Sequence, residues 1–452
     1  MHRRELLSVA GLGLTGPGSR FSLQARERGP TPKARSCVVL FLFGGPSQID
    51  LWDMKPKAPR EVRGEFEPIE TSVPGIALCE HLPRLATQMH HLCLVRSLTH
   101  RMNVHGPACS EVFTGREYQG PPVTDQATPE DWPSLSALTT RFGRSAEGLP
   151  PAVVLPWYLQ FPGQSKRIAG QSGGRMGERF NPLLIQGQLD DDSLASSGLR
   201  IDPLAPWGRL ADRRRLLADL ERQAGHLPAR AIDEFRMSAA SAYTLLQHRT
   251  ADRLDLSEES PQVRSAYGES SVGRSLLAAR RLVEAGVPLV NVNWEDETKI
   301  DGVNTCWDTH QENFPKLKGL LCPLFDQVFP TFVADLQERG LLETTLVVAL
   351  GEFGRTPKLG QFSQSSNTRP SGRDHWPHAF TALVAGGGVR GGQVYGATNS
   401  NAGHVVDKPV TPADLTATIL SHLGVDPTRE YLDEFQQLPR RLSEGEVITD
   451  WS

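Results

Sequence analysis

The segment TLVVALGEFGRTPKLG, residues 345–360, carries the clearest structural pattern in the chain. Its first residues are apolar and partly β-branched, which is typical of a strand buried on both faces of a sheet. A carboxylate, Glu352, follows between two glycines, and Arg355 lies three residues further on. Parallel sheets place chemistry at the carboxyl ends of their strands, because loops converge there. We therefore interpret the segment as a central strand that delivers Glu352 to a crevice.

Other apolar runs predict further strands of the same sheet, at residues 37–45, 287–294 and 379–387. Helical periodicity alternates with them, and it predicts helices at residues 273–286, 312–340 and 411–424. We expect Gly286 to end the first helix, Pro330 to break or bend the second, and Thr411 or Pro412 to start the third. This alternation predicts an α/β fold, a three-layer α/β/α sandwich with a mostly parallel central sheet.

The composition is ordinary for a globular protein. The chain has 452 residues, of which 38% are hydrophobic and 22% charged, and its net charge is −4. Lys and Arg are scattered along the chain, so we expect no nucleic-acid partner. Six cysteines lie far apart without zinc-finger spacing, which leaves one or two disulfides open but pairs none of them.

The first 33 residues read as a Tat-type export signal and linker. Arg3 and Arg4 precede a short, glycine-rich apolar run that is too short to span a bilayer as a helix. The alternative is a ragged N-terminus with two chance arginines. We expect a periplasmic or secreted protein, and because residues 22–29 hold no strong cleavage site, an uncleaved signal would act as a membrane tether. Residues 34–452 are interpreted as one domain, with a variable insertion around 121–270.

Acidic and imidazole side chains concentrate in the loops that follow the predicted strands. Asp-x-His and Asp-His pairs offer oxygen and nitrogen donors side by side, which suits a divalent ion, zinc first, with manganese, calcium or iron as alternatives. One or two ions would be held. In the bland alternative the aspartates cap helices, the histidines pack on tryptophans, and Glu352 pairs with Arg355. The candidate ligands are Asp50, His105, Asp308, His310, Glu352, Asp374 and His375.

A family resemblance rests on several motifs. FLFGGPSQIDLWDMKP, WDTHQENF, GEFGRTP, GRDHWPHAF and GGVRGGQVYGATN resemble the bacterial family called domain of unknown function 1501, over nearly the whole chain. That family is similar to the alkaline phosphatase and sulfatase superfamily, which implies an alkaline phosphatase-like fold and a two-metal site for phosphoryl or sulfuryl transfer. By this resemblance Glu352 matches an Asp ligand, Phe353 stands where relatives carry His, and His375 matches a later ligand.

The loop HGPACSEVFTGR, residues 105–116, resembles the sulfatase nucleophile loop, with His105 at the nucleophile position. The residue that sulfatases convert to formylglycine is absent, which disfavours their mechanism. Imidazole can attack phosphorus itself, or it can bind the metal and leave a water to attack. Both roles stay open for His105, with ligation favoured, and Cys109 or Ser110 would be poor substitutes as nucleophiles.

These observations lead to two functional hypotheses. The first is an exported metal-dependent hydrolase of phosphate or sulfate esters, a phosphatase, phosphodiesterase or sulfatase-like enzyme acting on a small molecule or a polysaccharide. The second is a catalytically inactive relative that binds anionic polysaccharide outside the cytoplasm or assembles surfaces. In the first, His105 and Arg355 are the catalytic candidates. The candidate substrate-binding residues are Asn103, Arg355, Arg373 and His378.

Overall fold

The computed structural model describes residues 29–120, 127–161, 167–186, 255–294, 307–364 and 368–451, together with four single positions between 212 and 219. Residues 1–28 of the expected export signal, Cys306, and much of the expected insertion at 121–270 lie outside these ranges. In the described parts of the chain, no helix has the length and apolar character needed to cross a membrane. The five described cysteines are buried, and no disulfide joins any two of them.

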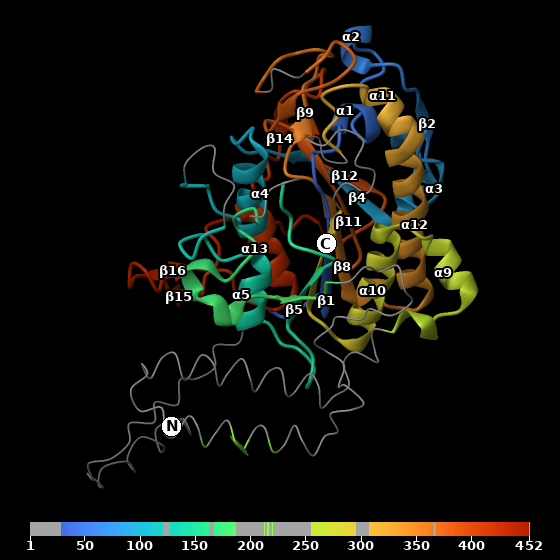
Figure 1. Ribbon diagram of the computed structural model, residues 1–452. Coiled ribbons are helices and arrows are strands. Elements are labelled where there is room, and N and C mark those ends of the chain that lie inside the picture. The colour runs from blue at the N-terminus through green and yellow to red at the C-terminus, as the bar shows by residue number, and fades with distance from the viewer. Residues whose placement is uncertain are drawn as a thin grey trace, which may run out of the picture.

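An eight-stranded sheet forms the centre of the molecule (Figure 1). All neighbouring strands are parallel except β11, which runs antiparallel to β4 and β8, so the expected mostly parallel sheet is confirmed. In spatial order the strands are β12 (Gln393–Tyr395), β4 (Leu92–Leu98), β11 (Phe380–Ala385), β8 (Thr345–Leu350), β1 (Ser36–Leu42), β7 (Leu289–Trp294), β5 (Ala152–Leu155) and β6 (Leu183–Leu184).

The four expected strands are present as β1, β7, β8 and β11, whereas β4, β5, β6 and β12 were not predicted from the sequence. Two of these, β5 and β6, come from the segment 121–270, so part of that segment builds the sheet itself. The register pairs Leu42 of β1 with Trp294 of β7, and Phe41 with Leu350 of β8. Three neighbouring strands therefore end together, and their loops leave from one edge.

Helices cover both faces of the sheet, which makes three layers (Figure 1). Alternating side chains of β1 enter two separate cores: Val38 and Leu40 enter one, Val39 and Phe41 the other. The first core packs against α3 (Pro83–Thr87), α9 (Pro261–Tyr267), α10 (Ser271–Ala285) and α12 (Cys322–Glu338). The second packs against α4 (His105–Thr114), α5 (Leu135–Phe142) and α13 (Pro412–His422).

Most of the predicted helix ends are confirmed. Gly286 follows α10 with a φ of 104°, a conformation that favours glycine, and Thr411 caps α13 in a reciprocal capping box with Asp414. Of the expected break or bend near Pro330, the break is wrong, because α12 continues through this residue. The irregularity lies earlier, where a π-helical stretch (Leu317–Leu321) joins α11 (Asn313–Lys316) to α12.

In the described residues, short helices and four two-stranded pairings lie outside the central sheet. A two-stranded pairing of β9 with β10 sets Arg355 opposite His375. The remaining elements are α1 (Gln48–Leu51), α2 (Arg60–Arg63), β2 (Pro68–Glu70), β3 (Ala77–Cys79), β9 (Gly354–Arg355), β10 (His375–Trp376), β13 (Ala397–Thr398), β14 (Val405–Asp407), β15 (Glu430–Leu432) and β16 (Pro439–Arg441).

A buried ion pair fixes the loop after β1 to the loop before β10. Arg373 donates from Nε and Nη2 to the two oxygens of Asp50, both at 2.8 Å, and neither side chain is exposed. Ser47 and Asn313 also donate to Asp50, at 2.6 and 2.9 Å. The remaining hydrogen bonds of Arg373 go to backbone carbonyls, including that of Val62. The pair thus joins segments more than 300 positions apart.

Replacing Asp50 with Asn should destabilise the protein by about 3–5 kcal/mol, because it leaves the Arg373 guanidinium buried without its counter-charge. The free energy of unfolding, measured by denaturant titration, checks this. Arg274→Gln is the matched control: its partner Glu269 is exposed, and losing this pair should cost no more than about 1 kcal/mol. Equal effects of the two substitutions would contradict the structural role of the Asp50–Arg373 pair.

Candidate metal centre

Four buried side chains converge at the sheet edge where β1, β7 and β8 end. They are His105, Asp308, His310 and His375, and each offers one ligand atom within 4.8 Å of the others. His105 begins α4, after the loop that leaves β4, and Asp308 and His310 belong to the loop after β7. His375 precedes β11, and because β11 is antiparallel, its amino end lies at this same edge. The one antiparallel strand of the sheet therefore brings a third loop to the site.

The three imidazoles present Nε2 to the Asp308 carboxylate. The Nε2 atoms of His105, His310 and His375 lie 3.3, 3.0 and 3.2 Å from its oxygens. The Nε2 atoms of His310 and His375 are themselves only 2.9 Å apart. Two imidazole nitrogens at this separation need a shared proton or a cation between them.

Each imidazole is held from outside through Nδ1. His375 Nδ1 donates to the backbone carbonyl of Asn103 at 2.7 Å, and His310 Nδ1 lies 3.0 Å from the Thr368 hydroxyl. His105 Nδ1 lies 2.5 Å from a carboxylate oxygen of Glu352. Such outer contacts fix which nitrogen of a metal-binding histidine faces the ion. Here all three rings are oriented with Nε2 inward.

His375 is prepared as a neutral ligand. Its burial lowers its pKa to about 3, and the positive charge on His105 adds to the effect. A carbonyl oxygen can only accept, so the proton of the neutral ring sits on Nδ1, facing Asn103. The Nε2 lone pair is therefore free and points into the cluster.

His105 is held differently because two carboxylates contact it. Burial alone lowers its pKa, but Asp308 and Glu352 outweigh burial and raise the pKa to about 9. Glu352 is itself fixed by the Gly44 amide, which donates to both of its oxygens at 3.0 and 3.1 Å. The Glu352 carboxylate, just after β8, thus contacts the imidazole of His105 at the start of α4. The Gly44 amide, in the loop after β1, fixes the position of this carboxylate.

Arg355 supports Asp308 and is not presented to a substrate. Its guanidinium lies 2.5 Å from an Asp308 oxygen and donates its other hydrogen bonds to backbone carbonyls, including those of Gly45 and Trp307. Burial would raise the pKa of Asp308, but Arg355 and His105 hold it well below its usual range. The expected anion clamp does not match this geometry, since Arg355 and Arg373 are both fully buried.

The structure brings together some of the expected ligands and separates others. His105, Asp308, His310 and His375 form the cluster, with Glu352 one contact outside it. Asp50 lies outside the cluster, in its ion pair with Arg373. Asp374 accepts from the backbone amides of Ser363, Gln364 and His375, at 2.8 Å each, and one oxygen lies 3.6 Å from His310 Nδ1.

Two expected substrate-binding residues occupy other positions. Asn103 contacts the site through its backbone carbonyl and not through its amide side chain. His378 is exposed and packs beside His404 and Trp376, with ring centroids 5.4 and 4.8 Å away. Desolvation lowers the pKa of His378, and His404 adds to the effect. Neither side chain enters the cluster.

Aromatic rings enclose one side of the cluster. Phe353 stacks on His375, with centroids 4.4 Å apart and planes 27° apart, and Phe43 and Phe161 lie edge-on to His105. Gly45 makes this packing feasible, because a Cβ there would lie 2.6 Å from the Phe353 ring. His105 is the most exposed member of the cluster, at 9%. Access from solvent is therefore on the His105 side.

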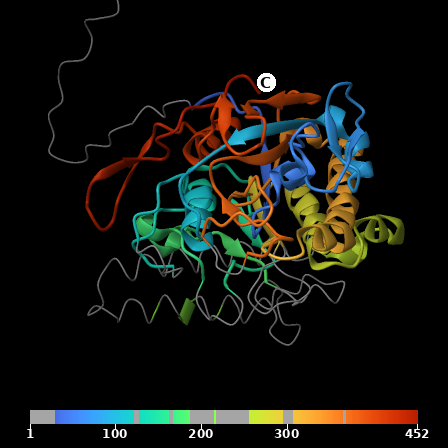
Figure 2. The same cartoon turned by 90° about the horizontal axis from the view of Figure 1, so that it is seen from above.

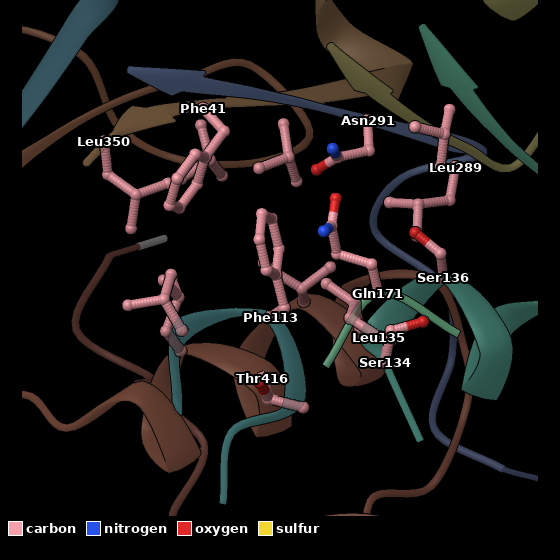
Figure 3. Close-up of a pocket in the computed structure, with 16 residues that line it drawn as sticks. Phe41, Phe113, Ser134, Leu135, Ser136, Gln171, Leu289, Asn291, Leu350 and Thr416 are labelled. Atoms are coloured by element: carbon pink, nitrogen blue, oxygen red, sulfur yellow. The ribbon is translucent and has the colours of Figure 1, made fainter. Parts of the chain in front are cut away.

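Hollows elsewhere in the described chain do not include the cluster. A small cavity of about 30 Å³ lies between the sheet and helices α4, α5 and α13, lined by Phe41, Phe113, Gln171 and Asn291 among others (Figure 3). A larger groove of about 500 Å³ lies between α3, α9 and α12. No cluster residue lines either one, so we place the candidate site at the cluster itself.

The donor set fits one divalent ion. Ligands about 2.1 Å from a tetrahedral ion lie roughly 3.4 Å from one another. Four separations among the donor atoms are 2.9 to 3.3 Å, and all of the donor atoms lie within 4.8 Å of one another. Three imidazole nitrogens and one carboxylate suit zinc, manganese or iron. Calcium prefers an all-oxygen shell and fits poorly.

Several groups that support the cluster could not be identified from the sequence by the type of their side chains. The Gly44 amide and the Asn103 carbonyl act through the backbone, and Thr368 is one of many threonines. His100 is the exception, since a histidine five residues before His105 is visible in the sequence. It lies 2.5 Å from the Glu352 carbonyl, and burial lowers its pKa to about 4.

Comparisons with solved structures return distant similarities. A sulfatase from Pseudoalteromonas sp. is 14% identical, with a TM-score of 0.38, over 93% of this chain and 71% of that one. An alkaline phosphatase from the Antarctic bacterium TAB5 is 10% identical, with a TM-score of 0.35, over 88% and 99%. The lipoteichoic acid synthase LtaP from Listeria monocytogenes is 9% identical, with a TM-score of 0.37, over 88% and 74%.

Comparison by sequence is more specific. No curated protein matches the chain. One family model does match it, from residue 34 to residue 451, and this range includes the whole cluster. The chain therefore belongs to the family described as protein of unknown function (DUF1501).

Proposed function

We propose that the protein is an exported metal-dependent hydrolase of phosphate or sulfate esters that uses a single divalent ion, zinc first. One observation carries the proposal: three imidazoles point Nε2 at one carboxylate, and each is oriented by a separate outer contact. Such an arrangement is costly without a cation, because it gathers buried polar groups that would otherwise need water. Export is inferred from the twin arginine alone.

The surroundings favour one ion over two. Among the described residues, the other expected ligands are already engaged: Asp50 with Arg373, Asp374 with backbone amides, and Glu352 with Gly44 and His105. The Arg355 guanidinium already compensates the charge of the Asp308 carboxylate, at 2.5 Å. A fixed positive side chain thus does part of the electrostatic work of a second ion.

The residues of the chain define the chemistry. A bound divalent ion would polarise the ester and lower the pKa of a water. Asp308, His310 and His375 would hold it, and His105 would be the fourth protein ligand while Glu352 keeps the proton on Nδ1 of His105. The water would then need a fifth coordination position. The ion and Arg355 carry more positive charge than Asp308 and Glu352 neutralise, so the site attracts an anionic ester. Phe353 and Phe43 exclude water beside the ligands.

A binding role without turnover is the second candidate. One observation favours it: every cluster residue is at least 91% buried, and the two expected substrate-clamping arginines are bonded to protein groups. In that case the ion would stabilise a surface that binds anionic polysaccharide outside the cytoplasm. Metal content does not separate the two candidates, but turnover does.

Purified protein loaded with zinc should contain one ion per chain and hydrolyse an aryl phosphate, phosphodiester or sulfate ester. His375→Ala should lose the ion, as measured by elemental analysis, and lose turnover by at least about 100-fold. His378→Ala, a nearby exposed histidine outside the cluster, should keep both. Loaded protein without turnover on any of these esters would reject the hydrolase and leave the binding role, and two ions per chain would reject the single-ion site.

Metal affinity should rise with pH up to about 9. The metal-free protein keeps His105 protonated below its pKa of about 9, so an incoming ion must displace one proton. The dissociation constant for zinc, measured by competition with a chelating dye, should fall about tenfold per pH unit from pH 7 towards 9 and then level off. A constant affinity across this range would show that His105 is not a ligand.

Glu352→Gln should weaken zinc binding by about 10- to 100-fold even at pH 9.5, because it loosens the orientation of His105. The pH at which the zinc affinity stops rising should also fall below 9, since one of the two carboxylates that raise the pKa of His105 is lost. Glu343→Gln, at the opposite end of β8, is the matched control and should change neither. A lower affinity with an unshifted pH profile would contradict the electrostatic coupling of Glu352 to His105.

A further inference from the structure

The hairpin of β15 and β16, residues 430–441, projects from the body of the protein (Figures 1 and 2). It carries three large apolar side chains that are half exposed: Leu432 at 49%, Phe435 at 51% and Leu438 at 51%. Among the described residues, exposed large apolar side chains are few and otherwise scattered. A cluster of them on one projection indicates a contact surface.

The hairpin tip is held in place by buried charges. Asp433 is fully buried, accepts from the amides of Phe435 and Gln436 at 2.9 and 3.0 Å, and pairs with Arg175 at 3.1 Å. Next to it, Glu434 pairs with Arg179 at 2.6 Å. These contacts fix the conformation of the turn, which keeps the side chains of Phe435 and Leu438 exposed to solvent.

The strand pattern separates an inner face from an outer face. Tyr431 is buried in the core between α4, α5 and α13, while its neighbour Leu432 faces out, opposite Pro439. The outer face and the tip therefore form one apolar surface. We call this surface, made of Leu432, Phe435, Leu438 and Pro439, the apolar tip.

Unpaired arginines flank the apolar tip. Arg141 and Arg429 both lie over the Phe142 ring, 5.1 and 5.0 Å from its centroid, and neither forms an ion pair within the described chain. Arg441 lies opposite Glu430 in the hairpin. The pKa of Arg141 is lowered by its burial and by the like charges of Arg179 and Arg429, which outweigh the opposing effect of Glu434.

Carboxylates on this side are mostly engaged. Glu434 pairs with Arg179, and Glu444 with Arg116 at 2.8 Å. Glu430 faces Arg441 across the hairpin. The cationic side chains around the tip are therefore in excess, and an approaching anion would relieve their mutual repulsion.

The N-terminal segment joins the fold beside this hairpin. Gly29 packs against the backbone of Gly424 and Asp426, and the amides of Lys33 and Ala34 both donate to the His422 carbonyl at 2.9 Å. Asp426 is only three residues before Arg429. An export signal kept as a tether would thus leave the folded part beside the residues that lead into the hairpin.

We propose that the apolar tip and its flanking arginines form a docking surface for an anionic lipid bilayer. Leucine and phenylalanine side chains enter the boundary between headgroups and acyl chains, and arginines bind lipid phosphates. A polysaccharide would use the arginines but leave the apolar side chains in water. A second copy of the chain fits this surface less well, because a stable protein–protein interface typically involves about 20–30 residues from each partner and the apolar tip has only four side chains.

Co-sedimentation of the full chain with vesicles tests the proposal. Binding to vesicles that contain 30% phosphatidylglycerol should exceed binding to pure phosphatidylcholine vesicles by at least tenfold and weaken in high salt. The double variant Phe435→Ser with Leu438→Ser should lower the partition constant at least tenfold, and Arg141→Gln with Arg429→Gln should lower it at least fivefold. All of these side chains lie outside the metal cluster, so zinc content and ester hydrolysis should stay unchanged.

Val406→Ser is the matched control, because Val406 is an exposed apolar residue, at 65%, on another element; it should bind vesicles like the wild type. Wild-type binding by the Phe435 and Leu438 double variant would overturn the proposal. So would a wild-type dimer that the double variant loses, or dextran sulfate binding as tight as vesicle binding and unaffected by that variant. None of these outcomes affects the hydrolase proposal, which depends on the metal cluster alone.

Discussion

The Asp308 carboxylate is the group on which the whole site depends. It is buried, yet it stays ionised because Arg355 and His105 lie against it. The Nε2 atoms of three imidazoles surround its two oxygens. Without this negative charge, the cluster would be a set of like groups with no reason to meet. The fold can be understood as the means of bringing four loops to this one side chain.

That convergence depends on the direction of the strands. Parallel β1, β7 and β8 end in register, so the loops that carry Gly44, Asp308 and Glu352 leave the sheet side by side. The antiparallel strand β11 starts where the others end, and it brings His375 from the opposite chain direction. The β9–β10 pairing then aligns His375 with Arg355. Strand direction and strand pairing therefore determine which loops meet around the cluster.

Much of this was predictable from the sequence, for a physical reason. Continuous apolar runs such as residues 345–350 report burial directly, and Asp308, His310 and His375 adjoin strands that the apolar pattern predicted. His105 follows β4, which was not predicted from the sequence. The roles of Asp50 and Asp374 could not be distinguished from those of the ligands, because a carboxylate looks the same whether it faces a metal, a guanidinium or backbone amides. The same holds for Arg355 and Arg373, whose buried partners are mainly carbonyl groups. Strand β5 has only four residues, too few for a periodic signal. In the π-helical stretch at 317–321, the apolar residues recur in the sequence at the same intervals as in an ordinary α-helix.

The carbonyl of Asn103 orients a ring that no side chain of that residue touches. Alanine scanning would therefore score position 103 as tolerant and miss its contribution, since every amino acid supplies the same peptide oxygen. Only changes that redirect the main chain, such as proline insertion, or that weaken the acceptor, such as an amide-to-ester replacement at the following bond, would expose it. Residues chosen by evolutionary or mutational sensitivity alone would give an incomplete inventory of this centre.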